Sequence, residues 1–333
     1  MAVERAAPAA VVDEPGGRSL LRTVGAVAAI RRMEFYVVEL TIFAMPVLVV
    51  ATSTGDLTRW TVLEGLAMFF ALYTLGDVIN CLADRDLDAV YKTRLSRAVY
   101  RIGVRRVTAV VIGSTVVGVA LAVHLAAATG RWLILGLVVV GVFLGIEYSV
   151  RPLYFKGRGI WHLVCLWLLL YFLPMLCASL LVVDALTAEV TVLAAAYATV
   201  EMGIILINTS EDLPEDRTAG IRTTTVALGL VPTLWLACAM VAVGGAAFCA
   251  SWLHLDAQHG VAPLGYLAVG ALALVCATVL ARLLALARAA AHAGEQAAIR
   301  MVKANGPLVP VAATLVGWMG VLCGVVVFGA RVG

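Results

Sequence analysis

Charged residues are scarce in this chain. They make up 14% of its 333 residues, against about a quarter of an ordinary soluble domain, and hydrophobic residues make up 62%. Metal-binding patterns of cysteine and histidine are missing too. The seven cysteines form no Cys-x-x-Cys pair, so none of the five histidines belongs to a zinc pattern of paired cysteines and histidines. These absences exclude a soluble globular domain, a disulfide framework and a zinc site. The composition predicts an all-α polytopic membrane protein.

Nine hydrophobic runs are each long enough to cross a bilayer, which takes about 20 helical residues. We predict spans at roughly 34–52, 61–81, 107–128, 132–150, 160–183, 190–209, 226–250, 262–286 and 307–330. In that arrangement 21 of the 24 Lys and Arg residues fall on one side, and only Arg59, Arg131 and Arg331 on the other. Because basic residues favour the cytoplasmic side, we expect the N-terminus to be cytoplasmic and the C-terminus to lie on the opposite side of a bacterial inner or plasma membrane.

The first 30 residues contain no apolar run long enough for a signal peptide. Asp13, Glu14 and Pro15 interrupt the only candidate. We predict a disordered cytoplasmic tail over residues 1–30 and a transmembrane domain over 31–333. Residues 24–32 have the composition of a short amphipathic helix at the membrane surface. The expected partners include membrane lipids but no nucleic acid.

An acidic motif follows the second predicted span. If the helix continues, Asn80, Asp84 and Asp88 share one face over roughly 12 Å, because each step of four residues rotates by only about 40°. Stacked carboxylates resist ionisation unless a cation lies between them. Their hard oxygen ligands favour Mg²⁺, which binds a few carboxylates together with phosphate oxygens.

The same spacing recurs after the sixth predicted span. Asn208, Asp212 and Asp216 repeat the Asn-x3-Asp-x3-Asp pattern at the end of another long apolar run. Pro214 lies inside this second motif, so we expect the helix to bend or break there. Both motifs are predicted on the same membrane face, and together they predict a metal site made of these six residues.

Basic residues flank both motifs. Lys92 and Arg94 follow the first motif, Lys156 lies in the loop between spans four and five, and Arg222 follows the second motif. Such residues either anchor the protein to anionic headgroups or clamp an anionic substrate at the metal. Both interpretations remain open from the residues alone.

Three further carboxylates lie near the first motif or inside span one. Asp86 is two residues from Asp84, which is about 200° of helix, so it is predicted to point away into solvent. Asp77 is within reach of the helix face that Asn80, Asp84 and Asp88 share, and it is predicted to support these ligands. Glu39 lies about one turn inside the membrane edge, where it either forms an interhelical hydrogen bond or belongs to the site.

The two motifs and the loop Tyr148-Ser149-x-x-Pro152-x3-Lys156 together resemble the UbiA superfamily of intramembrane prenyltransferases. The stretch from Asp212 to Thr223 is similar to the family pattern Asp-x3-Asp-Arg-x2-Gly-Ile-x-Thr. The resemblance extends from residue 34 onward. It implies a horseshoe of nine helices around a lipid-open cavity, in which two Mg²⁺ ions bind the diphosphate of a prenyl donor.

The resemblance also implies roles for residues in this chain. The implied metal ligands are Asn80, Asp84, Asp88, Asp212 and Asp216, to which the repeated spacing adds Asn208. The implied diphosphate-binding residues are Lys92, Arg94, Tyr148, Lys156 and Arg222. The candidate catalytic residues are Asp84, Asp88, Asp212, Asp216 and Lys156. An Arg-Pro pair common beyond the first motif is absent here, where the chain reads Lys92-Thr-Arg94-Leu-Ser-Arg97, so the acceptor is unknown.

The expected reaction is Mg²⁺-dependent transfer of a prenyl group to a hydrophobic acceptor, an aromatic ring or a lipid, with release of diphosphate. The aromatic candidates to stabilise the allylic cation are Tyr148, Tyr171, Phe172 and Tyr197. Alternatives are an intramembrane terpene cyclase with the same metal site, phosphoribosyl transfer to a polyprenyl phosphate, a transporter and a membrane scaffold. Transport acids usually lie near the membrane midplane, whereas these acids follow the spans.

Overall fold

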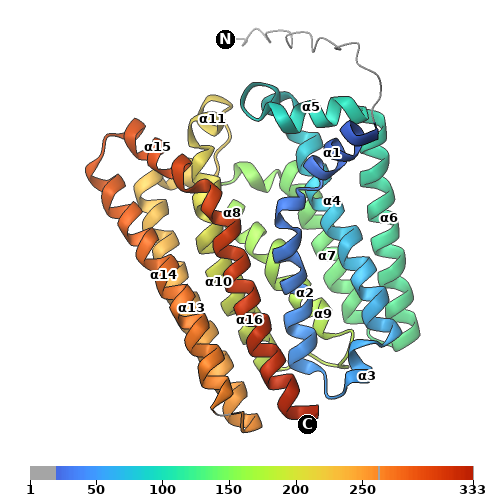
Figure 1. The fold of residues 1–333 in the computed structure, drawn as a ribbon. Coiled ribbons are helices and arrows are strands. Elements are labelled where there is room, and N and C mark those ends of the chain that lie inside the picture. Colours follow the sequence, from blue (N-terminus) through green and yellow to red (C-terminus); the bar gives the residue numbers. More distant parts are fainter. Residues whose placement is uncertain (1–19, 262, 333) are drawn as a thin grey trace.

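The computed structural model of the protein describes residues 20–261 and 263–332, and this part of the chain is helical without strands (Figure 1). The helices are α1 Leu20–Ile30, α2 Tyr36–Val50, α3 Thr54–Leu57, α4 Trp60–Tyr91, α5 Thr93–Ile102, α6 Val104–Thr129, α7 Trp132–Ser149, α8 Ile160–Trp167, α9 Leu173–Ser179, α10 Ala188–Glu211, α11 Leu213–Thr218, α12 Thr224–Leu228, α13 Leu230–His259, α14 Leu264–His292, α15 Glu295–Asn305 and α16 Val309–Val332. Short 3₁₀ turns lie at η1 Met33–Phe35, η2 Phe155–Gly157 and η4 Gly306–Leu308, and a π-helical turn, η3, at Leu168–Phe172.

Nine helical segments of the described residues are long and apolar enough to cross a membrane, so the predicted number is confirmed. The second segment, Thr54–Tyr91, extends well beyond the predicted 61–81. Hydropathy marks only the apolar part of a helix, whereas α4 continues through its acidic motif. The last segment likewise begins at Glu295, because α15 leads into α16.

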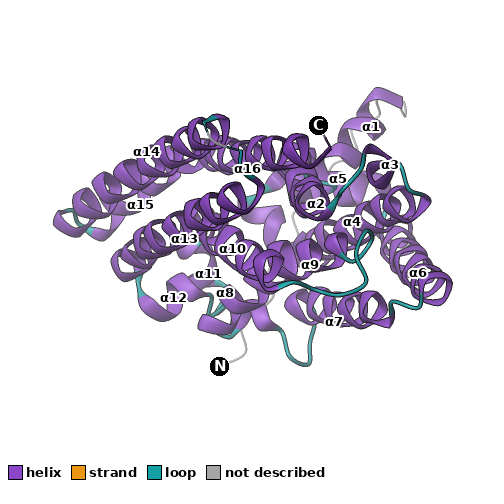
Figure 2. Ribbon diagram, turned by 90° about the horizontal axis from the view of Figure 1, so that it is seen from below, coloured by secondary structure: helices purple, strands orange, loops and turns teal. Residues whose placement is uncertain are grey.

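α10 lies at the centre of the bundle. It packs against α13, α16, α2 and α9, as the end-on view shows (Figure 2). Glycines permit the close approach of α10 and α13: a Cβ on Gly203 would lie 2.9 Å from the carbonyl oxygen of Ala237, and one on Gly244 only 2.5 Å from the nitrogen of Val200. Small residues at such crossings are typical of helix packing in membranes.

The bundle has two chemically different ends. The end with α3 carries the three basic residues predicted for the opposite side. Arg59 pairs with Asp56 at 2.7 Å, Arg131 with Asp184 at 2.6 Å, and Arg331 donates to carbonyls at the end of α2. α5, α11 and α15 lie at the other end (Figure 1), where both acidic motifs end.

The predicted boundary of the N-terminal tail needs a correction. Residues 1–19 lie outside the described part of the chain, but residues 20–30 form α1 rather than a disordered segment. The helix expected at 24–32 therefore begins earlier, at Leu20. α1 is ordered because it packs on α5 and α4, with Ala26, Ala29 and Ile30 buried in that contact.

Candidate active site

One helix face carries the first acidic motif. α4 continues unbroken to Tyr91, so Asn80, Asp84 and Asp88 follow one another at intervals of about one turn. All three line an internal cavity of about 270 Å³. Ser149 at the end of α7 donates a hydrogen bond to Oδ1 of Asn80 at 3.4 Å. α4 therefore presents an amide and two carboxylates to the same space.

The second motif is divided between two helices. α10 ends at Glu211, and α11 begins after Asp212 with Pro214 in its first turn. The expected break is thus present, because proline has no N–H to continue the preceding helix. Asn208, Asp212 and Asp216 nevertheless line the same cavity as the first motif. The fold brings the six predicted ligands to one end of one cavity.

Thr223 fixes the position of Asp216. Its hydroxyl donates to Oδ2 of Asp216 at 3.0 Å, and the N–H of Ile221 donates to the Asp216 carbonyl at 2.8 Å. Burial raises the pKa of Asp216 to about 6, while the hydrogen bond from Thr223 opposes this rise. The ionisation of Asp216 therefore depends on hydrogen-bond donors and cations close to it.

Two lysines reach the acidic motifs. Lys156, in the η2 turn, pairs with Asp84, and Lys92, the residue after α4, donates to Oδ2 of Asp212 at 2.7 Å. Burial alone would lower the pKa of Lys156, but the Asp84 carboxylate raises it above its usual range, so this lysine is charged. Both lysines line the cavity. An anion bound between the motifs would lie within their reach.

Tyr148 and His162 form a pair on the cavity wall. The Tyr148 hydroxyl lies 3.0 Å from Nε2 of His162, and the two rings are stacked with centroids 5.7 Å apart. Nδ1 of His162 lies 3.1 Å from the hydroxyl of Thr224. His162 had no role in the sequence analysis, because it is isolated in the sequence and its partners come from other helices.

Two predicted cations do not line the cavity. The Arg94 side chain is 72% exposed, and it lies 3.8 Å from Glu34. Arg222 is exposed as well. Arg32, which the sequence analysis did not select, does line the cavity, with its guanidinium 5.0 Å from the centre of the Phe35 ring. Its position depends on the turn between α1 and α2, which no sequence motif marks.

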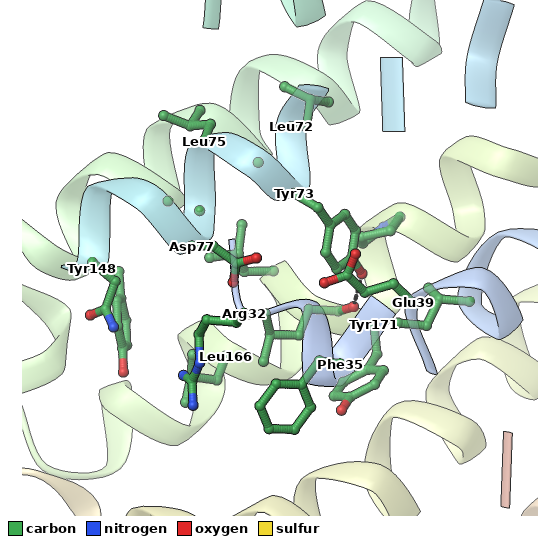
Figure 3. A pocket seen from close by; sticks show the side chains of 18 of the residues that line it. Arg32, Phe35, Glu39, Leu72, Tyr73, Leu75, Asp77, Tyr148, Leu166 and Tyr171 are labelled. Atoms are coloured by element: carbon green, nitrogen blue, oxygen red, sulfur yellow. Dashed lines mark hydrogen bonds between the residues drawn. The ribbon is translucent and has the colours of Figure 1, made fainter. Parts of the chain in front are cut away.

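Away from the acidic end the cavity wall is largely apolar. It is lined there by Gly65, Met68, Phe69, Leu72, Leu137, Val138, Leu169 and Leu181. The π-helical turn η3 contributes part of this wall (Figure 3). In an α-helix the Leu170 carbonyl would accept from residue 174, which is a proline; instead, Tyr73 of α4 donates its hydroxyl to that carbonyl.

The four aromatic candidates divide into two pairs. Tyr148 and Tyr171 line the cavity. Phe172 is not part of its wall and stacks on Trp167 with centroids 4.6 Å apart. Tyr197 is fully buried behind Tyr171, with ring centroids 5.7 Å apart, and its hydroxyl lies 2.9 Å from that of Thr41. Of the four candidates, only Tyr148 and Tyr171 therefore line the cavity.

The acidic residues fit Mg²⁺ better than a metal with an all-protein cage. Within residues 20–261 and 263–332, no three His, Cys, Asp or Glu side chains are close enough to hold a metal ion by themselves. Mg²⁺ typically takes one or two carboxylates and completes its shell with water and substrate phosphates. The carboxylates Asp84, Asp88, Asp212 and Asp216, with two amides, form such an incomplete oxygen ligand set.

Comparison with known proteins leads to the family that the two acidic motifs resemble. A sequence profile described as the UbiA prenyltransferase family matches residues 40–300. The chain is also 31% identical over 235 residues to a lycopene elongase/hydratase of Haloferax volcanii, a match that covers 68% of this chain and 75% of that protein.

Solved structures of UbiA homologues have a similar fold. A UbiA homologue from Archaeoglobus fulgidus bound to GPP and Mg²⁺ has a TM-score of 0.59 and 15% identity, and the match covers 87% of this chain and 99% of that one. A homologue from Aeropyrum pernix K1 has a TM-score of 0.54 and 20% identity, covering 85% and 97%. At these identities the likeness concerns the fold.

Proposed function

Because the chain belongs to the UbiA prenyltransferase family, we propose that it transfers the prenyl group of a prenyl diphosphate to an apolar acceptor, with Mg²⁺ bound at both acidic motifs. It is a multi-pass membrane prenyltransferase; the donor, the metal ions and the acceptor are our proposal. One observation carries it: two motifs and two lysines from separate parts of the chain converge on one end of a cavity whose remaining wall is largely apolar.

The polar end of the cavity suits the departure of diphosphate. Mg²⁺, when bound, would neutralise the diphosphate and so make it a better leaving group. Asp84, Asp88, Asp212 and Asp216 would hold the metal ions, and Lys92 and Lys156 would donate to the phosphate oxygens. As the allylic C–O bond breaks, its electron pair stays on the diphosphate and an allylic cation remains.

The apolar end suits the prenyl chain and the acceptor. Tyr148 and Tyr171 line the cavity, and an aromatic ring attracts a developing carbocation to its face. The apolar walls keep water away from that cation. The relative from Haloferax volcanii is named a lycopene elongase/hydratase, so the acceptor class we favour is a long unsaturated hydrocarbon of the lycopene type.

We place the acidic end of the bundle at the cytoplasmic side of the membrane. The distribution of Lys and Arg supports this orientation, with all but three of the 24 basic residues assigned to that side. A soluble diphosphate donor made in the cytoplasm would then reach Lys92 and Lys156 directly. Residues 20–332 are proposed as the catalytic domain.

The test is a comparison of Asp84→Asn and Asp212→Asn with Asp86→Asn, using purified protein in lipid nanodiscs with Mg²⁺, dimethylallyl diphosphate and lycopene. Asp86 is a matched control, because its side chain is 68% exposed and is not part of the cavity wall. We expect at least about a 100-fold loss of diphosphate release in the first two variants, and wild-type rates in the third.

Mass spectrometry of the products distinguishes the alternatives. Coupled product requires both substrates, whereas a terpene cyclase would convert a longer donor such as geranylgeranyl diphosphate into cyclic hydrocarbon without any acceptor. Wild-type rates in Asp84→Asn or Asp212→Asn would refute the proposed metal site.

A further inference from the structure

A second charged cluster lies on the cavity wall, beginning one helical turn before Asn80 of the first acidic motif. Arg31, which follows α1, donates to both carboxylate oxygens of Glu39 on α2, at 3.0 and 2.6 Å, and to Oδ2 of Asp77 on α4. Both carboxylates line the cavity. Asp77, Tyr73 and Glu39 border the same part of it (Figure 3). The proposed reaction of the diphosphate does not involve these residues.

The cluster has one guanidinium for two carboxylates. The Glu39 and Asp77 side chains are only 5% and 20% exposed, so most of the excess negative charge is removed from solvent. The adjacent Arg32 lines the same cavity and adds positive charge near Asp77, but its contacts among the described residues are with Phe35 and with Glu34 at 3.9 Å rather than with either carboxylate. Fastening α1 to the bundle would need only one carboxylate, and burying a second is costly. The second carboxylate therefore calls for a further role.

The two carboxylates differ in how they are held. Both oxygens of Glu39 are bound by Arg31. The hydrogen bond of Asp77, among the described residues, is made through Oδ2, so Oδ1 has no hydrogen-bond donor there on a side chain that lines the cavity. Asp77 is also seven residues before Asp84 on the continuous helix α4, which places it on the same face and roughly 10 Å further from the acidic end.

This distance from Asp84 suits the last step of a prenyl transfer to an alkene. The C–O bond of the donor breaks, and the electron pair of the acceptor double bond forms the new C–C bond. A tertiary cation remains on the acceptor carbon next to the new bond. It is quenched when the adjacent carbon loses a proton and the C–H electron pair becomes a double bond, or when water adds and then loses a proton.

We propose that Oδ1 of Asp77 accepts the proton that ends the reaction while Arg31 holds its Oδ2. The proposal rests on the proposed function, and it specifies the acceptor as an alkene, which requires such a proton acceptor. The diphosphate would be held at the level of Asp84, and its carbon chain would extend along α4 towards Asp77. The Asp77 carboxylate would also stabilise the cation before the proton leaves.

Asp77→Asn tests this role, because it removes the basic oxygen and keeps the shape. It leaves Arg31 paired one-to-one with Glu39, so the variant is expected to fold. Protein in nanodiscs would be given dimethylallyl diphosphate, lycopene and Mg²⁺, and the products would be separated into alkene and tertiary alcohol. We expect at least about a tenfold fall in the alkene product and a larger alcohol share, with donor binding and melting temperature unchanged.

Two further variants separate a proton acceptor from a structural anchor. Asp77→Glu keeps a carboxylate and is expected to restore the alkene product. Glu39→Gln weakens the anchor without touching Asp77; it is expected to lower the melting temperature but to retain the wild-type product ratio. An unchanged alkene yield and product ratio in Asp77→Asn would overturn the role of Asp77 alone, whereas the absence of any coupled product from the wild type would overturn the alkene acceptor itself.

Discussion

Lys92 and Asp212 are 120 residues apart in the chain, yet they form an ion pair of 2.7 Å that joins the end of α4 to the end of α10. Lys156 and Asp84 form a second pair across the same cavity. One carboxylate of each acidic motif therefore already has a cationic partner within the protein. Lys92 links the two motifs, and Lys156 links the first motif to the η2 turn; both would donate to the diphosphate if metal ions bound the carboxylates.

Lys156→Met is expected to destabilise the metal-free protein. It leaves Asp84 without its partner at a site where the side chain is 12% exposed, at a cost of about 1–3 kcal/mol. Mg²⁺ should raise the melting temperature of this variant more than that of the wild type, because the metal replaces the missing positive charge. Lys92→Met is the comparison: its pair is 45% and 32% exposed and should contribute less than about 1 kcal/mol. Equal Mg²⁺ effects in all three proteins would contradict the prediction.

Gly141→Leu is expected to shorten the space for the substrates. Gly141 of α7 lines the cavity, and a Cβ there would meet no atom within 4 Å, so the new side chain can enter the cavity without strain. We expect loss of coupling to long substrates, with diphosphate release from dimethylallyl diphosphate retained. Gly136→Leu on the same helix is the control, because Gly136 also has open space but does not line the cavity. Product yields measured with donors of increasing length would show the difference, and equal yields from both variants would count against this cavity as the substrate site.

Tyr73→Phe is expected to weaken the contact between α4 and the π-helical turn. It removes the hydroxyl that donates to the Leu170 carbonyl, for a loss of about 1 kcal/mol. Tyr36→Phe serves as the control, since the Tyr36 ring stacks on the Phe70 ring with centroids 5.1 Å apart, a contact that phenylalanine keeps. Thermal unfolding in detergent measures both. A loss of stability in Tyr36→Phe as large as that in Tyr73→Phe would show that the Tyr73 hydroxyl makes no particular contribution.

The sequence correctly predicted the arrangement of residues whose placement depends only on their own helix. The spacing of Asn80, Asp84 and Asp88 predicted a shared face, and α4 has it. Pro214 predicted the break inside the second motif, and α10 ends just before it. The sequence did not predict which residues on the turns between helices line the cavity. Arg94 lies away from the cavity and Arg32 lies in its wall, because the chain direction between helices is set by packing.

The sequence by itself determined the class of protein, the number of membrane segments and the six oxygen-bearing residues of the two motifs. Hydropathy and helical period are local properties, and both can be read along the chain. Only the tertiary structure decided that the two motifs share one cavity, that Lys92 and Lys156 partner their carboxylates, and that Asp77 with Glu39 and Arg31 forms a separate cluster further along it. Those relationships join helices far apart in sequence, and their free energy comes from burial and pairing that exist only once the bundle has formed.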